Sequence, residues 1–183
     1  MRIIAGEFRG RILLPPEGQD TRPITDRAKQ SLFDILAPII PDSEVYDCFA
    51  GTGSLGLECL SRGAESVTFF ESDRSAIQRL RRNIDALGVT GRCRLVASDL
   101  FRFFATAPPA AVNPIFLDPP YRFLRDRPDD LRTLALNFAQ HHVAPEGLVI
   151  FRHSRADTLD LPPFRTIDQR TYGSMAIDLL QRA

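Results

Sequence analysis

The segment YDCFAGTGSLG, residues 46–56, joins an apolar strand pattern to a helical one. The strand pattern is EVYDCF at 44–49, and the helical pattern is LGLECLSRG at 55–63, which closes on a glycine. Between them, GTGSLG fits the GxGxxG spacing of a turn whose backbone comes close to a nucleotide-type cofactor. The following helix would offer its N-terminus to the same ligand. This order predicts the first unit of an α/β sheet, with a ligand at the turn.

Alternating strand and helix patterns continue after this unit. The further strand patterns are VTFFE at 67–71, RLVAS at 94–98, PIFLD at 114–118 and GLVIF at 147–151. The helical positions between them are Ile77, Leu80, Ile84 and Leu87, and then Leu131, Leu134 and Phe138 in a helix over about 129–143. Strands that alternate with helices form a mostly parallel sheet covered on both faces.

The last two strand patterns break this alternation. FRTIDQR at 164–170 and SMAIDLL at 174–180 are joined only through Tyr172-Gly173, so they must pair antiparallel. A parallel sheet that ends in an antiparallel hairpin favours the methyltransferase variant of the Rossmann architecture over the dehydrogenase variant. The predicted fold class is therefore an α/β, Rossmann-like class I S-adenosylmethionine-dependent methyltransferase sheet.

An N-terminal extension precedes this sheet. Residues 2–14 contain RIIAG and GRILL around Gly6 and Gly10, which predicts a short β-hairpin. A helix is expected to begin at Thr25 or Asp26 and to end at Pro38, with an apolar face of Ala28, Leu32, Phe33 and Leu36. We expect residues 1–40 to be an RNA-contacting extension and residues 41–183 to be the methyltransferase domain.

Acidic residues stand at the ends of three successive strand patterns. Asp47 lies four residues before Gly51, where it would repel a pyrophosphate by about 3 kcal/mol for each phosphate charge at about 5 Å. The same carboxylate attracts the ammonium and sulfonium of S-adenosylmethionine, so we expect that cofactor in place of NAD(P). Glu71 would bind the ribose and Asp99 the adenine amino group. The expected cofactor contacts are Asp47, Phe49, Ala50, Gly51, Thr52, Gly53, Glu71, Ser72, Asp99 and Leu100.

A second motif, Asp118-Pro119-Pro120-Tyr121, follows the fourth strand pattern. The two prolines stiffen the chain and lack N–H groups, so this corner presents carbonyls that only accept hydrogen bonds. An ionised Asp118 also only accepts. These four residues are the predicted catalytic group, because an exocyclic amine has two N–H donors for such acceptors. Tyr121 could stack on the base, worth about 1–3 kcal/mol.

The chain resembles the bacterial 16S rRNA guanine-N2 methyltransferases of the RsmD type. The segments that carry the resemblance are RIIAGEFRGR at 2–11, TRPITDRAKQSLFDIL at 21–36, DCFAGTGSLGLECLSRGA at 47–64, FLDPPY at 116–121 and YG at 172–173. The resemblance implies methyl transfer to one guanine amino group of 16S rRNA, within an assembled or partly assembled 30S particle. Two small departures are Cys59, where the family often has alanine, and Ile24, where its usual motif has threonine.

Charge and composition limit how such a protein could bind RNA. The chain has no net charge, although 22 of its 23 basic residues are arginines, so binding would need a local basic face. The expected RNA contacts are Arg9, Arg11, Arg22, Arg27, Lys29 and Arg122. Three cysteines without CxxC spacing predict no metal site. The absence of a membrane span or leader pattern favours a cytoplasmic protein, which we expect to be monomeric.

Two alternatives remain open at this point. A DNA adenine-N6 methyltransferase would use the same acceptor corner, although 183 residues leave little room for a separate target-recognition domain. A non-catalytic RNA-binding module could keep the fold, but it would not need Asp47, Glu71, Asp99 and the Asp118 motif together.

Overall fold

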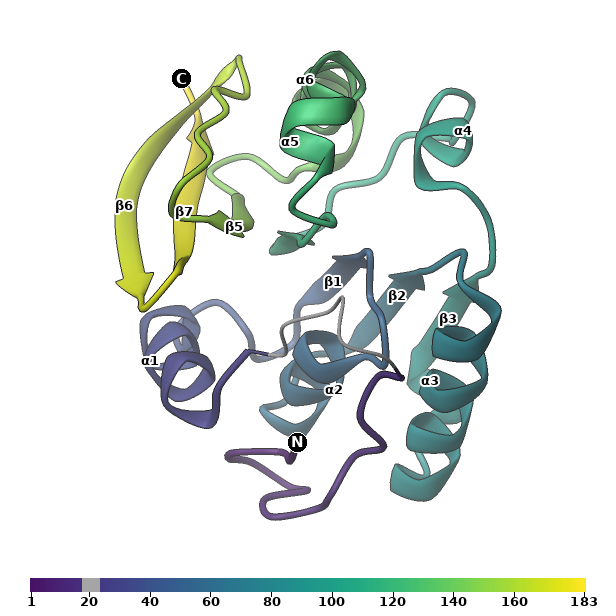
Figure 1. Cartoon of the computed structure of the whole chain (residues 1–183). Helices are drawn as coiled ribbons and strands as arrows, with labels where there is room; N and C mark the ends of the chain where they lie inside the picture. Colours follow the sequence, from purple (N-terminus) through teal and green to yellow (C-terminus); the bar gives the residue numbers. More distant parts are fainter. Residues whose placement is uncertain (18–23) are drawn as a thin grey trace.

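The computed structural model describes residues 1–17 and 24–183. Within these ranges one sheet has the strand order β3-β2-β1-β4-β5-β7-β6 (Figure 1). The strands are β1 (Glu44–Cys48), β2 (Ser66–Phe70), β3 (Cys93–Val96), β4 (Ile115–Leu117), β5 (Leu148–Ser154), β6 (Phe164–Tyr172) and β7 (Met175–Arg182). Strands β1 to β5 run parallel, whereas β7 runs antiparallel to both β5 and β6. The predicted fold class is confirmed.

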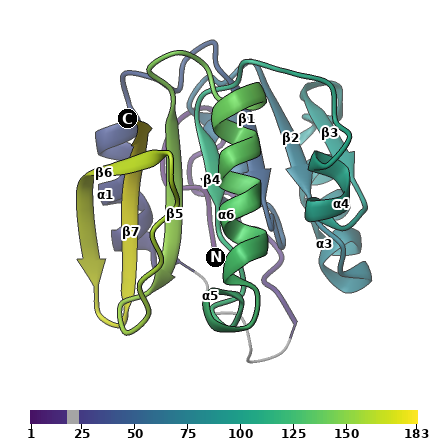
Figure 2. The ribbon, with the colours of Figure 1, turned by 90° about the horizontal axis from the view of Figure 1, so that it is seen from above.

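Helices cover both faces of the sheet, and a separate apolar core lies on each face (Figures 1 and 2). One face carries α1 (Asp26–Leu36), α2 (Ser54–Ser61) and α3 (Arg74–Leu87), and the other carries α4 (Leu100–Phe104), α5 (Phe123–Asp126) and α6 (Pro128–Asn137). A 3₁₀ turn (Thr90–Arg92) follows α3, and a π-helical turn (Phe138–His142) extends α6, which confirms the helix expected near 129–143.

Helix α1 follows the predicted pattern closely. The Thr25 hydroxyl accepts a hydrogen bond from the Ala28 amide at 3.2 Å, as an N-cap should. Its four expected apolar positions are buried in the core shared with α2 and the sheet. The far end of the sheet meets the same helix, because the hydroxyls of Tyr172 and Ser31 are hydrogen-bonded at 2.7 Å.

The predicted N-terminal hairpin is only partly right. The chain does turn back on itself, but within residues 1–14 it forms a single β-bridge, between Arg2 and Ile12, and no strand. The amides of Ile3 and Gly10 still bond across the turn, each at 2.9 Å, but those of Ile4 and Ala5 donate to the Glu58 carboxylate of α2, at 2.8 and 3.0 Å. Because α2 takes these donors, the segment becomes a loop fastened to that helix. The division at residue 40 stays a prediction.

Parallel strands bring their carboxyl ends to one edge of the sheet. The residues at the ends of β1 to β5 therefore gather there, including all four acids singled out in the sequence. Among the described residues, no helix is both long and apolar enough to cross a bilayer.

Candidate active site

The glycine turn after β1 is tight. Phe49, Gly51 and Gly53 all have positive φ, at 61°, 56° and 83°. At Gly53 a side chain would also meet Leu80 of α3, since an added Cβ would lie 2.4 Å from its Cδ1. Glycine is therefore favoured at this position by its backbone conformation, and a larger residue would also require the Leu80 side chain to move.

Hydrogen bonds from β2 and α3 hold the rest of this turn in place. The Ala50 amide donates to the Phe70 carbonyl at 3.0 Å, which continues the ladder between β1 and β2. Thr52 is buried, and its carbonyl accepts from the Asn83 side chain at 2.9 Å. Asn83 also bonds the backbone of Leu14, so α3 ties the N-terminal segment to the turn. Sequence reasoning missed Asn83, whose polar position in a helix gives no local signal of these contacts.

Asp47 lies inside the protein, beneath the expected cofactor position. Its side chain accepts from the Gly56 amide near the start of α2, at 2.9 Å. Burial, together with the charges of Asp118 and Glu71, raises the pKa of Asp47 to about 8, against the opposing effects of the Gly56 bond and the Arg152 charge. Burial therefore favours the neutral form of this carboxyl group. Its role toward a cationic cofactor stays a prediction.

Glu71 braces the glycine turn from the end of β2. Its carboxylate accepts from the Gly51 amide at 2.7 Å and from the amides of Ser72 and Asp73, both at 2.8 Å. A carboxylate offers about four lone-pair positions, so these bonds leave room for a further donor such as a ribose hydroxyl. The predicted ribose contact is compatible with this bracing role.

Asp99 caps helix α4, because it accepts from the Arg102 amide at 3.0 Å. Its second carboxylate oxygen lies 4.0 Å from the Arg127 guanidinium. The adjacent Leu100 is 5% exposed and packs in the core, which leaves its side chain little surface for an adenine ring. The cofactor contact expected of Leu100 stays a prediction.

A cluster of aromatic rings, which the sequence did not predict, stands beside Asp99. The Phe49 ring centroid lies 6.0 Å from that of Phe101 and 5.8 Å from that of Phe123. Arg127 covers the cluster, with its guanidinium carbon 4.1 Å from the Phe101 centroid. Since these residues follow β1, β3 and β4, sheet order alone brings them together.

Asp118 stands next to the glycine turn across one step of the β1–β4 ladder. Its amide donates to the Cys48 carbonyl at 3.3 Å. Its carboxylate accepts from the Arg152 Nε at 2.7 Å, and 18% of the side chain stays exposed. Burial raises the pKa of Asp118, and Arg152 opposes that rise. Sequence reasoning missed Arg152, the residue that follows GLVIF.

The rest of the motif lies in the turn that leads from β4 to α5. Pro119 is buried and Pro120 is exposed, while Tyr121 is half-buried. The Pro120 carbonyl accepts from the Phe123 amide at 2.8 Å, so it is occupied by this turn. The acceptors that this corner can offer a substrate are therefore Asp118 and the Pro119 carbonyl.

Lys29 does not belong to an RNA-binding surface, contrary to expectation. It is 1% exposed, and its Nζ lies 3.2 Å from a Glu58 carboxylate oxygen that is itself buried. It also donates to the Arg2 carbonyl at 2.7 Å and to the Ser54 hydroxyl at 3.2 Å. Lys29 therefore joins α1, α2 and the N-terminal loop from within.

The other expected RNA contacts are scattered. Arg9, Arg11, Arg27 and Arg122 are exposed, and Arg22 lies outside the described residues. Arg11 donates to the Ala86 carbonyl at 2.6 Å, in the last turn of α3. The contacts of these arginines with RNA stay predictions.

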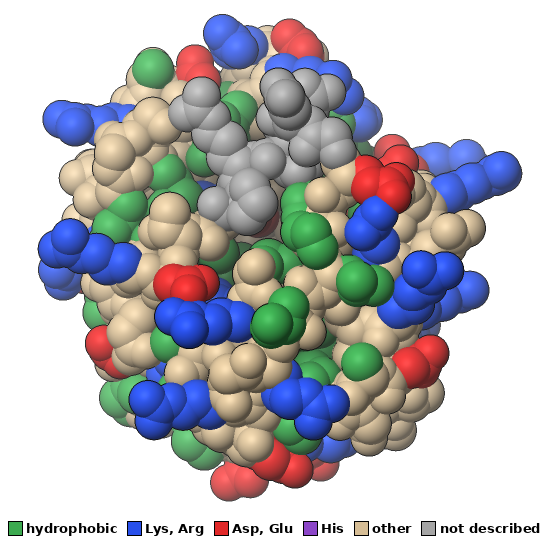
Figure 3. Space-filling model, turned by 60° about the horizontal axis from the view of Figure 1, so that its bottom comes forward, with side chains coloured by type: hydrophobic (Ala, Val, Ile, Leu, Met, Phe, Trp, Pro, Cys, Tyr) green, Lys and Arg blue, Asp and Glu red, His purple; other side chains and the backbone are tan. Residues whose placement is uncertain are grey.

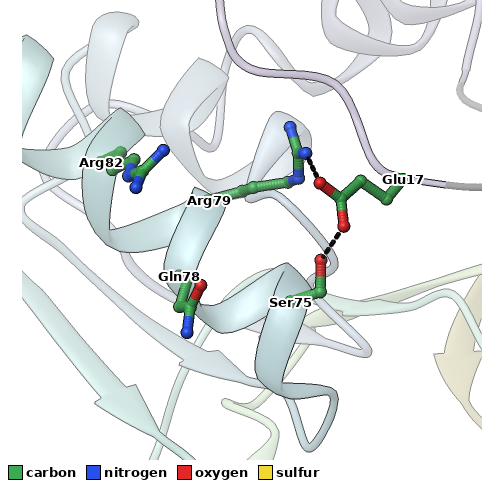
Figure 4. Close-up of a pocket in the computed structure, with 5 residues that line it drawn as sticks. All are labelled: Glu17, Ser75, Gln78, Arg79 and Arg82. Carbon is green, nitrogen blue, oxygen red and sulfur yellow. Dashed lines mark hydrogen bonds and ion pairs between the residues drawn. The ribbon is translucent and has the colours of Figure 1, made fainter.

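The N-terminal segment runs along α3 toward the candidate site. Arg11 contacts the end of that helix, whereas Glu17 reaches its beginning, where it bonds Ser75 at 2.7 Å and pairs with Arg79 (Figure 4). Gln78 and Arg82 complete a shallow hollow there. On this side of the molecule, arginines and acids alternate around the surface with no single basic patch (Figure 3).

The strand order and the residues of the site together define the class of protein to which this fold belongs. A glycine turn after β1, acids at the carboxyl edge and an antiparallel β7 between β5 and β6 are features of the class I methyltransferase fold. Within the described residues, no group of three or more His, Cys, Asp or Glu is arranged to hold a metal ion.

The chain belongs to the family described as Conserved hypothetical protein 95, whose model matches residues 1–181. It is 45% identical over 122 residues to "Ribosomal RNA small subunit methyltransferase D" of Escherichia coli (strain K12), an alignment that covers 67% of this chain and 61% of that protein. It is 34% identical over 158 residues to the Bacillus subtilis protein YlbH, which covers 85% of this chain and 83% of that protein.

A solved structure agrees over the full length. The Escherichia coli protein yhhF superposes with a TM-score of 0.83 at 37% identity, covering 100% of this chain and 97% of that one. The resemblance noted in the sequence is therefore confirmed at the level of the family.

Proposed function

We propose that this protein transfers a methyl group from S-adenosylmethionine to the exocyclic N2 amino group of a guanine in 16S rRNA. The observation that carries the proposal is the contact between the acceptor corner and the glycine turn. Asp118 bonds the Cys48 carbonyl one residue before that turn begins. A donor molecule held by the turn and an amine held by Asp118 would therefore meet at the same edge of the sheet.

The residues at this edge fit a positively charged donor. Asp47, Glu71, Asp99 and Asp118 supply four carboxyl groups, and Arg152 and Arg127 are the cations paired with two of them. When bound, S-adenosylmethionine supplies an electrophilic methyl group on its sulfonium. Glu71 and Asp99 would hold the nucleoside part, and Asp47 would favour the cationic end.

The acceptor corner fits an amine. Asp118 and the Pro119 carbonyl would each accept one of its N–H groups, which aims the nitrogen lone pair at the methyl group. The neutral amine attacks and loses its proton after transfer, so catalysis rests on positioning and on stabilising the positive charge that develops on nitrogen. Tyr121 would stack on the base.

The substrate is argued from the relatives. The Escherichia coli relative is named as a small-subunit rRNA methyltransferase, although this chain aligns with only 61% of its length. Guanine N2 as the target atom, a 30S particle as the form of the substrate, a monomeric state and a cytoplasmic location are further parts of the proposal.

A labelled-methyl assay tests the proposal. The protein is incubated with labelled S-adenosylmethionine and one of three substrates: free 16S rRNA, 30S particles from a strain that lacks the relative, or duplex DNA. Label in N2-methylguanine, mapped by mass spectrometry, is the expected result. Label in N6-methyladenine of DNA would favour the adenine-specific alternative, and RNA binding without transfer would favour a non-catalytic module.

A further inference from the structure

Resting on the proposed function, we propose that Arg152 is a positioning residue of the transfer site, which fixes the Asp118 carboxylate in place and supplies its counter-charge. Asp118 follows β4 and Arg152 lies in β5, where Leu117 pairs with Phe151. The next cross-strand pair is therefore Asp118 with Arg152. Both side chains project from the face that carries Phe116 and Ile150, because side chains alternate along a strand.

The ion pair joins these two side chains in a defined geometry. The Arg152 Nε lies 2.7 Å from the Asp118 Oδ1, and the side chains are only 12% and 18% exposed. Such a charge-assisted bond fixes the rotation of the carboxylate. With Oδ1 held by Arg152, Oδ2 is the oxygen left to accept from the substrate amine.

The charges around Asp118 explain why a cation is needed. Asp47 faces it from β1, Tyr121 lies in its own turn, and Arg152 faces it from β5. Glu71 adds a further acid that acts on Asp47. Burial disfavours the charged form of Asp118, and Arg152 is the basic group that opposes it.

The need for a counter-charge follows from the aspartate at the first position of the Asp118-Pro119-Pro120-Tyr121 motif. An asparagine at the first position would accept through a neutral amide oxygen and would need no counter-charge. An aspartate accepts through both oxygens only while it is ionised, because a protonated carboxyl turns one of them into a donor. Arg152 would thus be required for transfer because residue 118 is an acid, and it would not be required for folding.

Two single variants, one of them conservative, test this role. Arg152→Met should lower kcat at pH 7 by on the order of 10-fold or more, since each unit of pKa shift changes the ionised fraction up to tenfold. The acid limb of the pH–kcat profile should move to higher pH. Arg152→Lys should restore the position of that limb but not the full kcat, because it returns the charge without the planar fork.

The decisive comparison uses Asp118→Asn. In that background Arg152→Met should cost little further activity, and the shift of the acid limb should disappear. Equal losses in both backgrounds, or an unchanged pH profile in Arg152→Met, would overturn the proposal. Thermal unfolding and S-adenosylhomocysteine binding of each variant show that it is folded.

A second readout separates this inference from the proposed function. Carbon-13 NMR titration of labelled aspartates gives the pKa of Asp118 with no substrate present. It should be higher in Arg152→Met than in the wild type and Arg152→Lys, and an unchanged value would contradict the role. If the wild type transfers no methyl group to any substrate, the proposed function fails while this titration still tests the ion pair.

Discussion

Lys29 and Glu58 form an ion pair at 3.2 Å whose two side chains are 1% and 0% exposed. Arg62 joins the same carboxylate at 2.9 Å, and the amides of Ile4 and Ala5 complete its shell. Burial lowers the pKa of Lys29, and Glu58 opposes that change. Because Lys29 also reaches Ser54 at the start of α2, the pair links the N-terminal loop and α1 to the helix that follows the glycine turn.

Removing the Lys29 side chain should therefore make the protein less stable to unfolding. Lys29→Met leaves part of a buried carboxylate uncompensated, and we expect the free energy of unfolding to fall by about 3–5 kcal/mol. Urea denaturation followed by circular dichroism measures it. Arg27→Met, at an exposed position of the same helix, is the matched control and should change stability by about 0.5 kcal/mol or less. Similar small losses in both variants would show that the buried pair contributes little.

Asp47 should make stability depend on pH. Its pKa is about 8 in the folded protein, above the unfolded value of 3.8, so its contribution is complete below pH 3.8. It is then lost as pH rises toward 8, by up to about 1.4 kcal/mol per pH unit. Asp47→Asn should flatten this slope between pH 5 and pH 8, measured by urea denaturation across that range. Parallel curves for the two proteins would contradict the raised pKa.

Asp118→Ala should abolish methyl transfer while the cofactor still binds. Losing an acceptor that acts in the transition state should lower kcat by on the order of 10²-fold or more. Calorimetry with S-adenosylmethionine should give a Kd close to that of the wild type. Asp126→Ala, an exposed acid a few residues along the chain, is the control. Loss of cofactor binding in Asp118→Ala would remove the role given to this residue.

Substitutions at Gly6 and Gly10 give a controlled test of how the N-terminal loop is held. Both have φ of +83°, but an added Cβ at Gly6 would lie 1.8 Å from the Ser61 carbonyl oxygen, whereas nothing lies within 4 Å at Gly10. Gly10→Ala should cost about 1–2 kcal/mol from its backbone conformation alone. Gly6→Ala should cost considerably more, because it also forces the loop away from α2. Equal shifts in thermal unfolding would mean that the loop is not fastened there.

The periodic parts of the fold could be predicted from the sequence. The spacing of apolar residues predicted the strands and helices of the sheet, and Thr25 predicted the start of α1, because spacing and capping are local properties of the sequence. Lys29 was misplaced although a signal existed. It stands four residues before Phe33 and seven before Leu36, on the same helix face as those buried side chains.

Contacts between distant segments could not be predicted in this way. The N-terminal hairpin was expected because glycines flank a turn, yet the amides of Ile4 and Ala5 bond Glu58, more than 50 residues away. Arg152 pairs with Asp118 across 34 residues, through the register of β4 and β5. The local sequence indicates neither of these contacts, because each depends on which strands and helices become neighbours in the fold.

Strand β7 lies between β5 and β6, although it follows both along the chain. During synthesis β6 therefore leaves the ribosome before the strand that it pairs with. Until β7 arrives, the edge of β5 that carries Arg152 stays open, and Tyr172 cannot take its place against Ser31 on α1. The edge of β5 beside Arg152 is thus covered only once residues 175–182 have been made.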